Sequence, residues 1–284
     1  MEKVWPSGGF PFRVTTCEAE GSLYNEAMPR PRVVYPSAAI IALLSLLYSQ
    51  QPPADVPFPK LGEFYFVRTE YVDRPGLRRG FSRGWWRQDW PEADVHFTQG
   101  IRRLTRIDIG EPRHLPLTDD RVFDHPWIYA TQAGYWDLKD PEVIRLKEYL
   151  LRGGFLVVDD FYGEQDWAVF ENTVQRMFPD LPIVDIKDDD QVMHVVYEIK
   201  ERVFIPGLRH LRRGPGGYGG IQPQGTHPEW KGLYDGKGRL LIAINFQMDV
   251  GDAWEHADWP EYPEQMTALA YRFGINYIVY AMTH

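Results

Sequence analysis

Two adjacent carboxylates, Asp159 and Asp160, directly follow a short apolar segment and precede a pattern typical of a helix. Many α/β enzymes place a nucleophile or a metal ligand at a strand-to-helix turn of this kind. Adjacent side chains point in different directions, so we expect one of the two to face a site and the other to cap the helix that begins near Gly163. Helix capping alone is the competing interpretation, and the sequence leaves both open.

Similar polar and aromatic residues follow three other predicted strands. The carboxyl ends of parallel strands lie on one edge of a sheet, where α/β proteins bind their ligands. We expect the following residues to gather there with the two aspartates: Arg68, Glu70, Tyr71, Gln132, Tyr135, Trp136, Asp249, Asp252, Trp254 and Glu255. Carboxylates as acceptors and Trp and Tyr rings as walls suit a polar, carbohydrate-like ligand. The alternative is that these side chains only cap helices and fill the rim of the sheet.

A histidine near a carboxylate is a second candidate for acid–base chemistry. His227 and Glu229 flank Pro228, and a general base requires an imidazole that is oriented by such a group. Paired carboxylates could serve as acid and base, or could hold a divalent metal together with His227. We expect no other cofactor. For His194 and His256, simple exposure is expected more than a direct role.

Several familiar chemistries are excluded by motif. The chain has no H-E-x-x-H zinc motif, and its single cysteine, Cys17, allows neither a disulfide framework nor a cysteine-based zinc site. The acidic run 185–190 lacks the glycine and the distal glutamate of an EF-hand loop. The glycine-rich segment 214–220 lacks the lysine of a phosphate-binding loop and precedes no predicted helix.

The overall charge argues against a nucleic-acid partner. The net charge is −9, whereas binding to a phosphate backbone requires a concentrated positive field. One cluster runs against this balance: Arg74, Arg78, Arg79, Arg83 and Arg87. We interpret it as a solvated loop, with a site for an anionic small ligand as the alternative.

The apolar patterns predict strands that alternate with helices. Strands are predicted at residues 63–67, 106–109, 127–131, 155–158, 181–186, 195–199 and 240–246. Helices are predicted to begin near Asp89, which would provide an acidic cap, near Asp140 and near Gly163, and a last helix covers 263–273 with an apolar tail, 275–281. Such alternation implies βαβ crossovers and a mainly parallel sheet, which is the α/β class.

The N-terminal part differs from this pattern. Residues 1–27 show no periodicity, whereas Met28 opens a basic segment followed by the apolar run 38–48 and a proline-rich linker, 50–59. This order is typical of a secretory signal, and the run is short for a transmembrane helix, which takes roughly 20 apolar residues. We therefore expect Met28 to be the true start, 1–59 to be a signal and linker segment, and 60–284 to be one periplasmic or secreted domain. A short buried helix at 38–48 in a cytoplasmic protein is the alternative.

Several segments together resemble a known bacterial family. The segments are FYFVR at 64–68, WPEAD at 90–94, LLRGGFLVVDD at 150–160, MFP at 177–179, GRL at 238–240, DVGDAWE at 249–255 and FGINYIVY at 273–280. They are similar to the family catalogued as domain of unknown function 4159, over roughly residues 62–281. The resemblance implies a class I glutamine amidotransferase-like, flavodoxin-like three-layer α/β/α fold and an exported protein. It implies no established activity.

The resemblance also argues against one reaction. Amidotransferases of this fold carry a catalytic cysteine on the turn that corresponds to Asp159 and Asp160, and this chain has no cysteine there. His227 and Glu229 resemble the histidine and glutamate of the amidotransferase triad but have no cysteine partner, so thiol-based amide hydrolysis is excluded. Trehalose-utilisation-like proteins share the fold and also lack the cysteine, which connects the fold to carbohydrates by analogy only.

Two functions of different classes remain. The first is a domain that binds or hydrolyses a polar small ligand, with Asp159 or Asp160 as the central carboxylate and Asp249, Asp252 and Glu255 as partners. The second is a non-catalytic module that binds a partner protein through the Arg/Trp loop at 74–90. A concave acidic and aromatic pocket at the strand ends would favour the first, and a flat apolar patch around Trp85, Trp86 and Trp90 the second.

Overall fold

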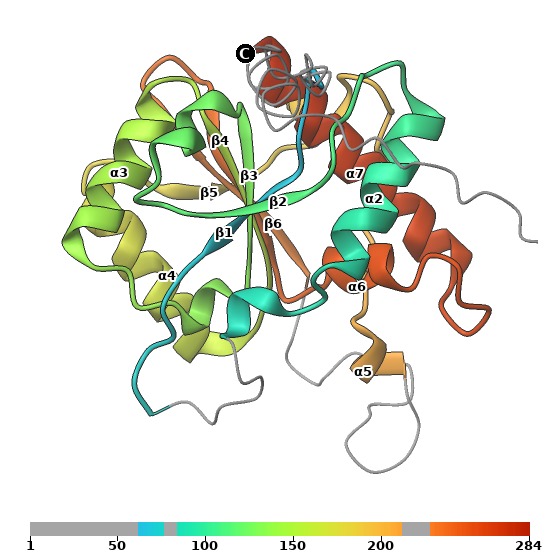
Figure 1. Cartoon of the computed structure of the whole chain (residues 1–284), viewed down its shortest axis with the longest axis horizontal. Helices are drawn as coiled ribbons and strands as arrows, with labels where there is room; N and C mark the ends of the chain where they lie inside the picture. The colour runs from blue at the N-terminus through green and yellow to red at the C-terminus, as the bar shows by residue number, and fades with distance from the viewer. Residues whose placement is uncertain (1–61, 77–83, 212–227) are drawn as a thin grey trace, which may run out of the picture. The chain divides into compact units, whose positions relative to one another are not determined.

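A seven-stranded, mostly parallel sheet forms the centre of this computed structural model, which describes residues 62–76, 84–211 and 228–284 (Figure 1). The strand order is β2-β1-β3-β4-β7-β6-β5. Strands β2, β1, β3, β4 and β7 run parallel, whereas β6 is antiparallel to both β7 and β5. The strands are β1 Val67–Glu70, β2 Arg113–Pro116, β3 Trp127–Thr131, β4 Phe155–Phe161, β5 Ile183–Asp185, β6 Glu229–Tyr234 and β7 Leu240–Phe246. The predicted α/β class with a mainly parallel sheet is therefore confirmed.

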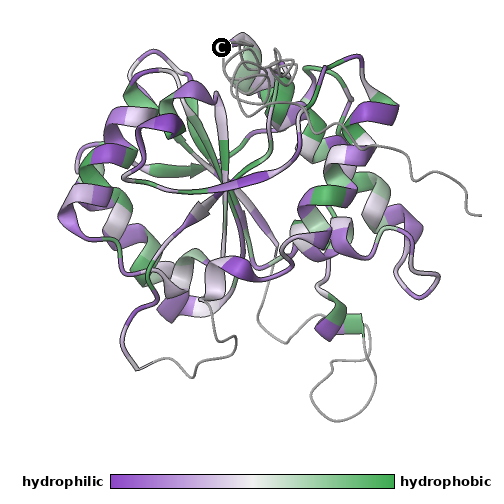
Figure 2. Cartoon of the chain, viewed as in Figure 1, coloured by the Kyte–Doolittle hydropathy of each residue, from purple (hydrophilic) through white to green (hydrophobic). Residues whose placement is uncertain are grey.

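Helices cover both faces of the sheet (Figure 1). One face packs against α2 (Glu92–Leu104), α6 (Val250–Glu255) and α7 (Glu264–Thr283), and the other against α3 (Asp140–Leu151) and α4 (Gly163–Met177). These helices mix hydrophilic and hydrophobic residues along their length, as expected for elements with one face on a core (Figure 2). Short helices complete the chain: η1 (Trp85–Arg87), η2 (Asp120–Asp124), η3 (Ala133–Tyr135), η4 (Gln191–Met193) and α5 (Leu208–Leu211).

Strand β4 shows why its sequence predicts a central position. All seven of its residues are buried, with Phe155 and Val157 in the hydrophobic cluster on one face and Leu156 and Val158 in the cluster on the other. Side chains alternate between the two faces of a strand, so residues 155–158, which hydrophobic clusters cover on both faces, are apolar at every position. The continuous run of apolar residues therefore identified a strand with a parallel neighbour on each side.

Helix α3 begins where the sequence predicted. The Glu142 carboxylate accepts a hydrogen bond from the backbone N–H of Lys139 at 2.8 Å, and Pro141 lies in the first turn. Just beyond the last turn, Gly153 has a φ of 108°, which a residue with a Cβ atom rarely adopts. The helix is thus bounded by local chemistry at both ends.

Three strand predictions were wrong, in different ways. Of the predicted strand 63–67 only Val67 belongs to β1, and Phe64 forms an isolated bridge with Ile109 of the predicted strand 106–109; the ladder of β1 and β2 begins at Val67 and Arg113. At 195–199 no strand forms, because the Asn276 side chain accepts the hydrogen bond of the Tyr197 N–H that a neighbouring strand would otherwise accept. In each case the alternation of apolar residues indicates buried side chains and not a strand that pairs with a neighbouring strand.

Two further elements had not been predicted. Strand β6 pairs antiparallel with β7, and the acidic segment after β7 forms α6. The predicted helix 263–273 and its apolar tail form one continuous helix, α7. Among the residues that the structure describes, no helix is long and apolar enough to cross a membrane.

Candidate functional site

The turns that follow β4 and β7 meet at the carboxyl edge of the sheet. The two strands are parallel neighbours, with Val158 opposite Ile244 and Phe161 opposite Phe246. The register shifts between Val158 and Phe161, and a shift of this kind re-aims the side chains within it. Asp159 and Asp160 lie in this irregular part of β4, one residue or two beyond the predicted strand end. The structure thus brings the two predicted acidic turns together.

Asp159 connects these turns directly. Its Oδ2 accepts hydrogen bonds from the backbone N–H groups of Val250 and Gly251, at 2.9 and 2.8 Å, and from the Tyr129 hydroxyl at 2.9 Å. Its Oδ1 is buried and has no hydrogen-bond partner among the described residues. Burial raises the pKa of Asp159 to about 6, although the three donors on Oδ2 and the backbone N–H of Asp160 act in the opposite direction.

Asp160 occupies the same turn with an unusual backbone. Its φ is 53°, and its Oδ2 accepts a short hydrogen bond from the Gln132 side-chain amide. It also hydrogen-bonds the Asp249 side chain. Burial raises the pKa of Asp160 well above its usual range, and the nearby Asp252 carboxylate adds to this effect. A carboxyl group with this surrounding favours the protonated form.

Asp249 and Asp252 hold the start of α6. Asp249 caps the helix through Oδ1, which accepts a hydrogen bond from the Asp252 N–H at 2.8 Å. Asp252 Oδ2 accepts a hydrogen bond from the Leu208 N–H at 2.5 Å. Burial and the Asp160 carboxylate raise the pKa of Asp249 well above its usual range. Asp249 therefore both caps a helix and belongs to the acidic cluster, although the sequence presented these roles as alternatives.

Asp89 joins this cluster and was missed as a site residue. It had been predicted as the acidic cap of the helix that became α2, but Pro91 is the N-cap and no side chain caps that helix. Its Oδ1 accepts a hydrogen bond from the Gln88 side chain at 2.6 Å, while its buried Oδ2 has no partner in the described part of the chain. Burial, followed by the Asp252 and Asp160 carboxylates, raises the pKa of Asp89 well above its usual range.

Backbone strain concentrates at this edge. In the described residues, positive φ angles at non-glycine positions occur at four places: Asp89, Gln132, Asp160 and Gln247. The last three lie at the ends of β3, β4 and β7, and Asp89 lies in the connection that follows β1 and leads to α2. Strained turns persist where the surrounding structure over-determines them, and they cluster at functional sites. The pattern supports a site here independently of the charges.

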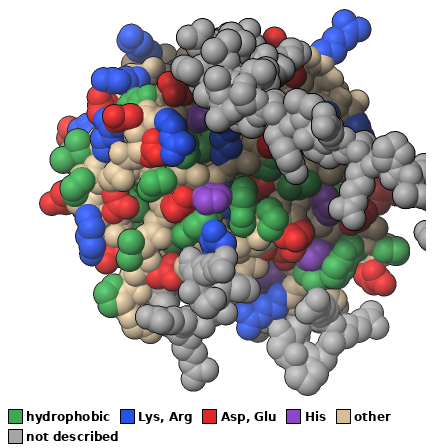
Figure 3. Space-filling model, in the orientation of Figure 1, with side chains coloured by type: hydrophobic (Ala, Val, Ile, Leu, Met, Phe, Trp, Pro, Cys, Tyr) green, Lys and Arg blue, Asp and Glu red, His purple; other side chains and the backbone are tan. Residues whose placement is uncertain are grey.

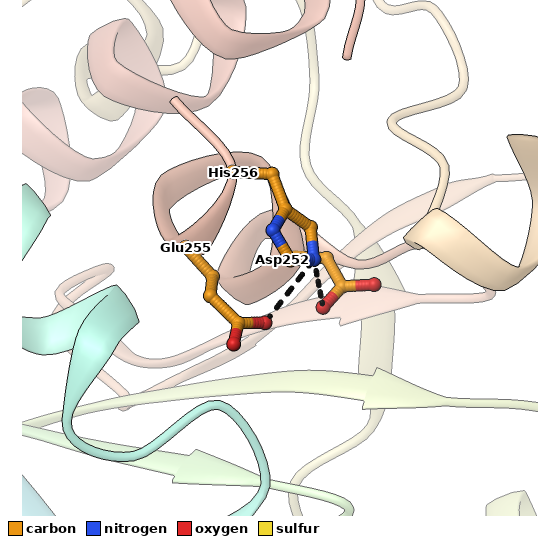
Figure 4. Close-up of side chains that lie close together, drawn as sticks. All are labelled: Asp252, Glu255 and His256. Atoms are coloured by element: carbon orange, nitrogen blue, oxygen red, sulfur yellow. Dashed lines mark ion pairs between the residues drawn. The ribbon is translucent and has the colours of Figure 1, made fainter. Parts of the chain in front are cut away.

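Glu255, the last residue of α6, and His256, which follows it, extend the acidic cluster. The imidazole Nε2 of His256 lies 3.3 Å from Glu255 Oε2 and 3.8 Å from Asp252 Oδ1 (Figure 4). The ring of His256 also packs on Trp259, with 4.2 Å between ring centroids. Burial, the Asp252 carboxylate and a hydrogen bond to it raise the pKa of Glu255 to about 7.

Arg68 does not act as the predicted ligand-binding residue. It is fully buried, forms a salt bridge with Asp94, and donates hydrogen bonds to the carbonyl groups of Trp86 and Gln88, at 3.2 and 2.7 Å for Nη1. All of its polar contacts are thus made to the protein. Its role in the site is indirect, because the carbonyls that it binds belong to the loop that carries Asp89.

The predicted aromatic walls also lie elsewhere. Trp254 is 1% exposed and stacks on Phe97, and the Trp136 indole donates to the Thr173 hydroxyl beneath α4. Both had been predicted from polar local sequence, but the helices that pack over them place them in the core. The Tyr71 hydroxyl donates to the carbonyls of Thr131 and Gln132, which leaves Tyr135 as the half-buried member of the set.

The remaining predicted residues lie at the margins. Glu229 starts β6 opposite Phe246 and forms an ion pair with Lys231 at 2.7 Å, while His227 lies outside the described residues. Glu70 contacts the His114 imidazole at 2.6 Å. The proposed acid–base pair of His227 and Glu229 therefore stays a prediction.

The described residues contain two groups whose ligand atoms lie close enough to hold a metal ion. One consists of Asp89, Asp249 and Asp252, and the other of Asp252, Glu255 and His256. Carboxyl groups of this density can bind polar ligands, transfer protons or coordinate a cation.

The fold and the site define an α/β protein with a mostly parallel sheet and a buried acidic cluster at its carboxyl edge. Over residues 67–282 the chain matches the family model described as domain of unknown function (DUF4159), and it belongs to this family. The resemblance inferred from the sequence segments is thereby confirmed. A search of curated proteins found no match to the chain.

Proposed function

We propose that the carboxyl edge of the sheet binds a small polar ligand with several hydroxyl groups, such as a carbohydrate, and that hydrolysis is the reaction which its carboxyl groups support. The observation that carries this proposal is the unpartnered, fully buried Oδ1 of Asp159, which lies among further carboxyl groups. Buried polar atoms are almost always hydrogen-bonded, so a ligand hydroxyl is a natural partner for this oxygen.

The acidities of the carboxyl groups fit such chemistry. Asp159 has a pKa of about 6 and Glu255 one of about 7, so both forms of each group exist near neutral pH. A hydrolase requires one group to donate a proton to the leaving oxygen and another to accept a proton from water. Two carboxyl groups at one site can divide these roles, as they do in glycoside hydrolysis.

The fold supports a ligand site at the same place. We propose membership of the flavodoxin-like group, because the parallel strands, numbered one to five along the chain, lie in the order 2-1-3-4-5. Folds with this order bind ligands beyond the carboxyl ends of the strands, next to the reversal of strand order. Asp89 follows β1, and Gln132 follows β3, which are the two strands beside that reversal.

No observation favours the protein-interaction module over this site. Trp86 is buried and lies beneath the Arg87 guanidinium, and both Trp86 and Trp90 pack on His114. Arg78, Arg79 and Arg83 of the predicted loop lie outside the described residues. On the face drawn in Figure 3, hydrophobic, acidic and basic side chains are interspersed.

We also propose that the protein is exported, on the strength of the basic and apolar segments at 28–48. These residues lie outside the described part of the chain. N-terminal sequencing of the protein from its native host tests the proposal. A mature chain that retains residues 30–45 would contradict it.

The test of the ligand site is a binding screen by thermal shift, followed by calorimetry, against neutral sugars and sugar acids in the presence of EDTA. We expect at least one compound to raise the unfolding temperature of the parent chain. Asp159→Asn and Asp160→Asn should abolish that rise, whereas Asp120→Asn, which removes an equal charge from an exposed helix on the amino side of β3, should retain it. If no compound shifts the parent chain, the proposed ligand class is wrong.

A further inference from the structure

We propose that Asp89, Asp249 and Asp252 form a binding site for one hard divalent cation, namely Mg²⁺, Mn²⁺ or Ca²⁺. We call these three residues the tri-aspartate site. The proposal adds to the ligand site described above but does not depend on it, since a cation can bind here whether or not an organic ligand does.

The spacing of the three carboxylates fits a cation. One oxygen from each residue lies within 4.8 Å of one oxygen from each of the others. Calcium binds oxygen ligands at about 2.3–2.6 Å and magnesium at about 2.1 Å, so ligands on opposite sides of either ion are roughly 4–5 Å apart. The three carboxylate oxygens are thus spaced as the ligands of a single ion are.

Among the residues that the structure describes, no lysine or arginine forms a salt bridge with the three aspartates, and the His256 imidazole lies 3.8 Å from Asp252 Oδ1. The three residues are 7%, 5% and 7% exposed. The buried guanidinium next to them belongs to Arg68, whose hydrogen bonds go to Asp94 and to backbone carbonyls. Buried carboxylates are stable when they are paired with a cation or coordinate a metal. A divalent ion would supply the charge that the surrounding side chains do not.

A separate observation points to a ligand rather than to mutual hydrogen bonding. Asp89 Oδ2 is buried and has no hydrogen-bond partner among the described residues. It is directed at the first turn of α6, because a Cβ atom on Gly251 would lie 3.0 Å from Asp89 Oδ2 and 3.5 Å from Asp249 Oδ1. The unpartnered oxygen therefore faces the element that carries the other two carboxylates.

At two glycines the backbone approaches the carboxylates closely. A Cβ atom on Gly207 would lie 2.6 Å from Asp249 Oδ2 and 3.0 Å from Asp252 Oδ2, and one on Gly251 would crowd Asp89 in the same way. Such approaches are too close for ordinary van der Waals contact, so both positions require a residue without a side chain. The backbone thus lies close to the carboxylates at two positions where a side chain would crowd them.

The group of Asp252, Glu255 and His256 competes for the same cation, because Asp252 belongs to both groups. It differs in chemistry, since an imidazole ligand suits zinc and related transition metals, whereas three carboxylates suit hard cations. It also differs in burial, because Glu255 is partly exposed. We favour the tri-aspartate site on these two grounds, and the choice can be tested.

The test is isothermal titration of the full chain with MgCl₂, MnCl₂, CaCl₂ and ZnCl₂, each alone, after removal of metals with EDTA and dialysis. We expect one of the first three to bind in a one-to-one ratio and to raise the unfolding temperature. Asp89→Asn and Asp249→Asn keep the side-chain size and should weaken that binding by at least about tenfold. Asp120→Asn, the control of equal charge, should bind as the parent chain does.

Gly251→Ala provides a variant that keeps all three carboxylates. The new methyl group would lie 2.8 Å from the Tyr129 hydroxyl and 3.0 Å from Asp89 Oδ2, so one or both side chains must shift and this variant should also bind the cation less tightly. Near-ultraviolet circular dichroism of each variant checks that its tertiary packing is retained.

Three outcomes would overturn the tri-aspartate site. The first is that none of Mg²⁺, Mn²⁺ and Ca²⁺ binds, and the second is that folded Asp89→Asn binds as tightly as the parent chain. The third is binding of Zn²⁺ alone that His256→Ala abolishes and Asp89→Asn retains, which would assign the cation to the competing group. The titrations contain no organic ligand and the sugar screen contains EDTA, so either proposal can fail without the other.

Discussion

Two buried aspartates lie close together in the sequence, but the charges that surround them differ. Asp94 and Asp89 are five residues apart, and burial raises the pKa of both carboxyl groups. At Asp94 the Arg68 guanidinium opposes that effect through a salt bridge and hydrogen bonds. At Asp89 the next carboxylates, Asp252 and Asp160, reinforce it. The difference shows that this fold can balance a buried charge with a salt bridge, whereas no described lysine or arginine forms one at the tri-aspartate site.

The largest effect on stability is expected from breaking the buried salt bridge between Arg68 and Asp94. Arg68→Met leaves Asp94 buried without its cation and frees the carbonyls of Trp86 and Gln88. Loss of one partner of a buried ion pair typically costs 3–5 kcal/mol, so we expect the free energy of unfolding to fall by about 4 kcal/mol. Urea unfolding of both proteins measures it.

A double variant provides the control. In Arg68→Met/Asp94→Leu no charge is left unpaired, so most of the lost stability should return. A loss of less than about 1 kcal/mol in the single variant would show that the Arg68–Asp94 pair is not balanced in the way described.

A somewhat smaller effect concerns the dependence of stability on pH. The pKa of Asp159 is raised from 3.8 to about 6 in the folded chain, so its contribution to stability is complete below 3.8 and is lost as the pH rises through about 6. In Asp159→Asn the group stays neutral. Relative to the parent chain in EDTA, the variant should gain stability between about pH 4 and pH 8, by up to roughly 3 kcal/mol. If the free energy of unfolding depends on pH in the same way in both proteins, Asp159 ionises in the folded state without loss of stability.

The smallest effect is a gain in stability, whereas Arg68→Met is expected to lose stability. Asp89→Asn removes one of several carboxylates that repel one another, so in EDTA we expect the free energy of unfolding at pH 8 to rise by about 1 kcal/mol. With a saturating hard cation the parent chain should become the more stable of the two, because the variant lacks a ligand. Asp120→Asn removes an exposed charge and should change stability by less than about 0.5 kcal/mol in either condition. A loss of stability in Asp89→Asn without metal would mean that Asp89 Oδ2 also has a partner in the fold.

The sequence was sufficient to predict the meeting of two acidic turns, but not the full cluster. The apolar runs of β4 and β7 identify two central parallel strands, so the residues after them had to lie on one edge. Asp89 could not be assigned in this way. Its local pattern is that of a helix cap, and its position depends on how the connection after β1 folds back over the sheet, which Arg68 determines through distant carbonyls.

The prediction that aromatic residues line the site was wrong for a related reason. Trp254 and Trp136 lie in polar stretches of sequence, which favoured exposure. Their burial depends on α2 packing over α6 and on α4 packing beside η3, and no local pattern reports contacts between elements so far apart in the chain. The sequence does contain one local indication of the site, because Gly251 lies between Asp249 and Asp252 and a glycine permits a close approach of the backbone.

The hydrogen bonds from Val250 and Gly251 to Asp159 have a consequence for how the two proposed sites behave together. They tie the end of β4 to the first turn of α6, so any movement of Asp159 toward an organic ligand also moves the backbone that carries Asp249 and Asp252. Cation and organic ligand should therefore not bind independently. Thermodynamic linkage then requires that each alter the affinity of the other by the same factor, and titrating one in the presence of the other measures that factor from either direction.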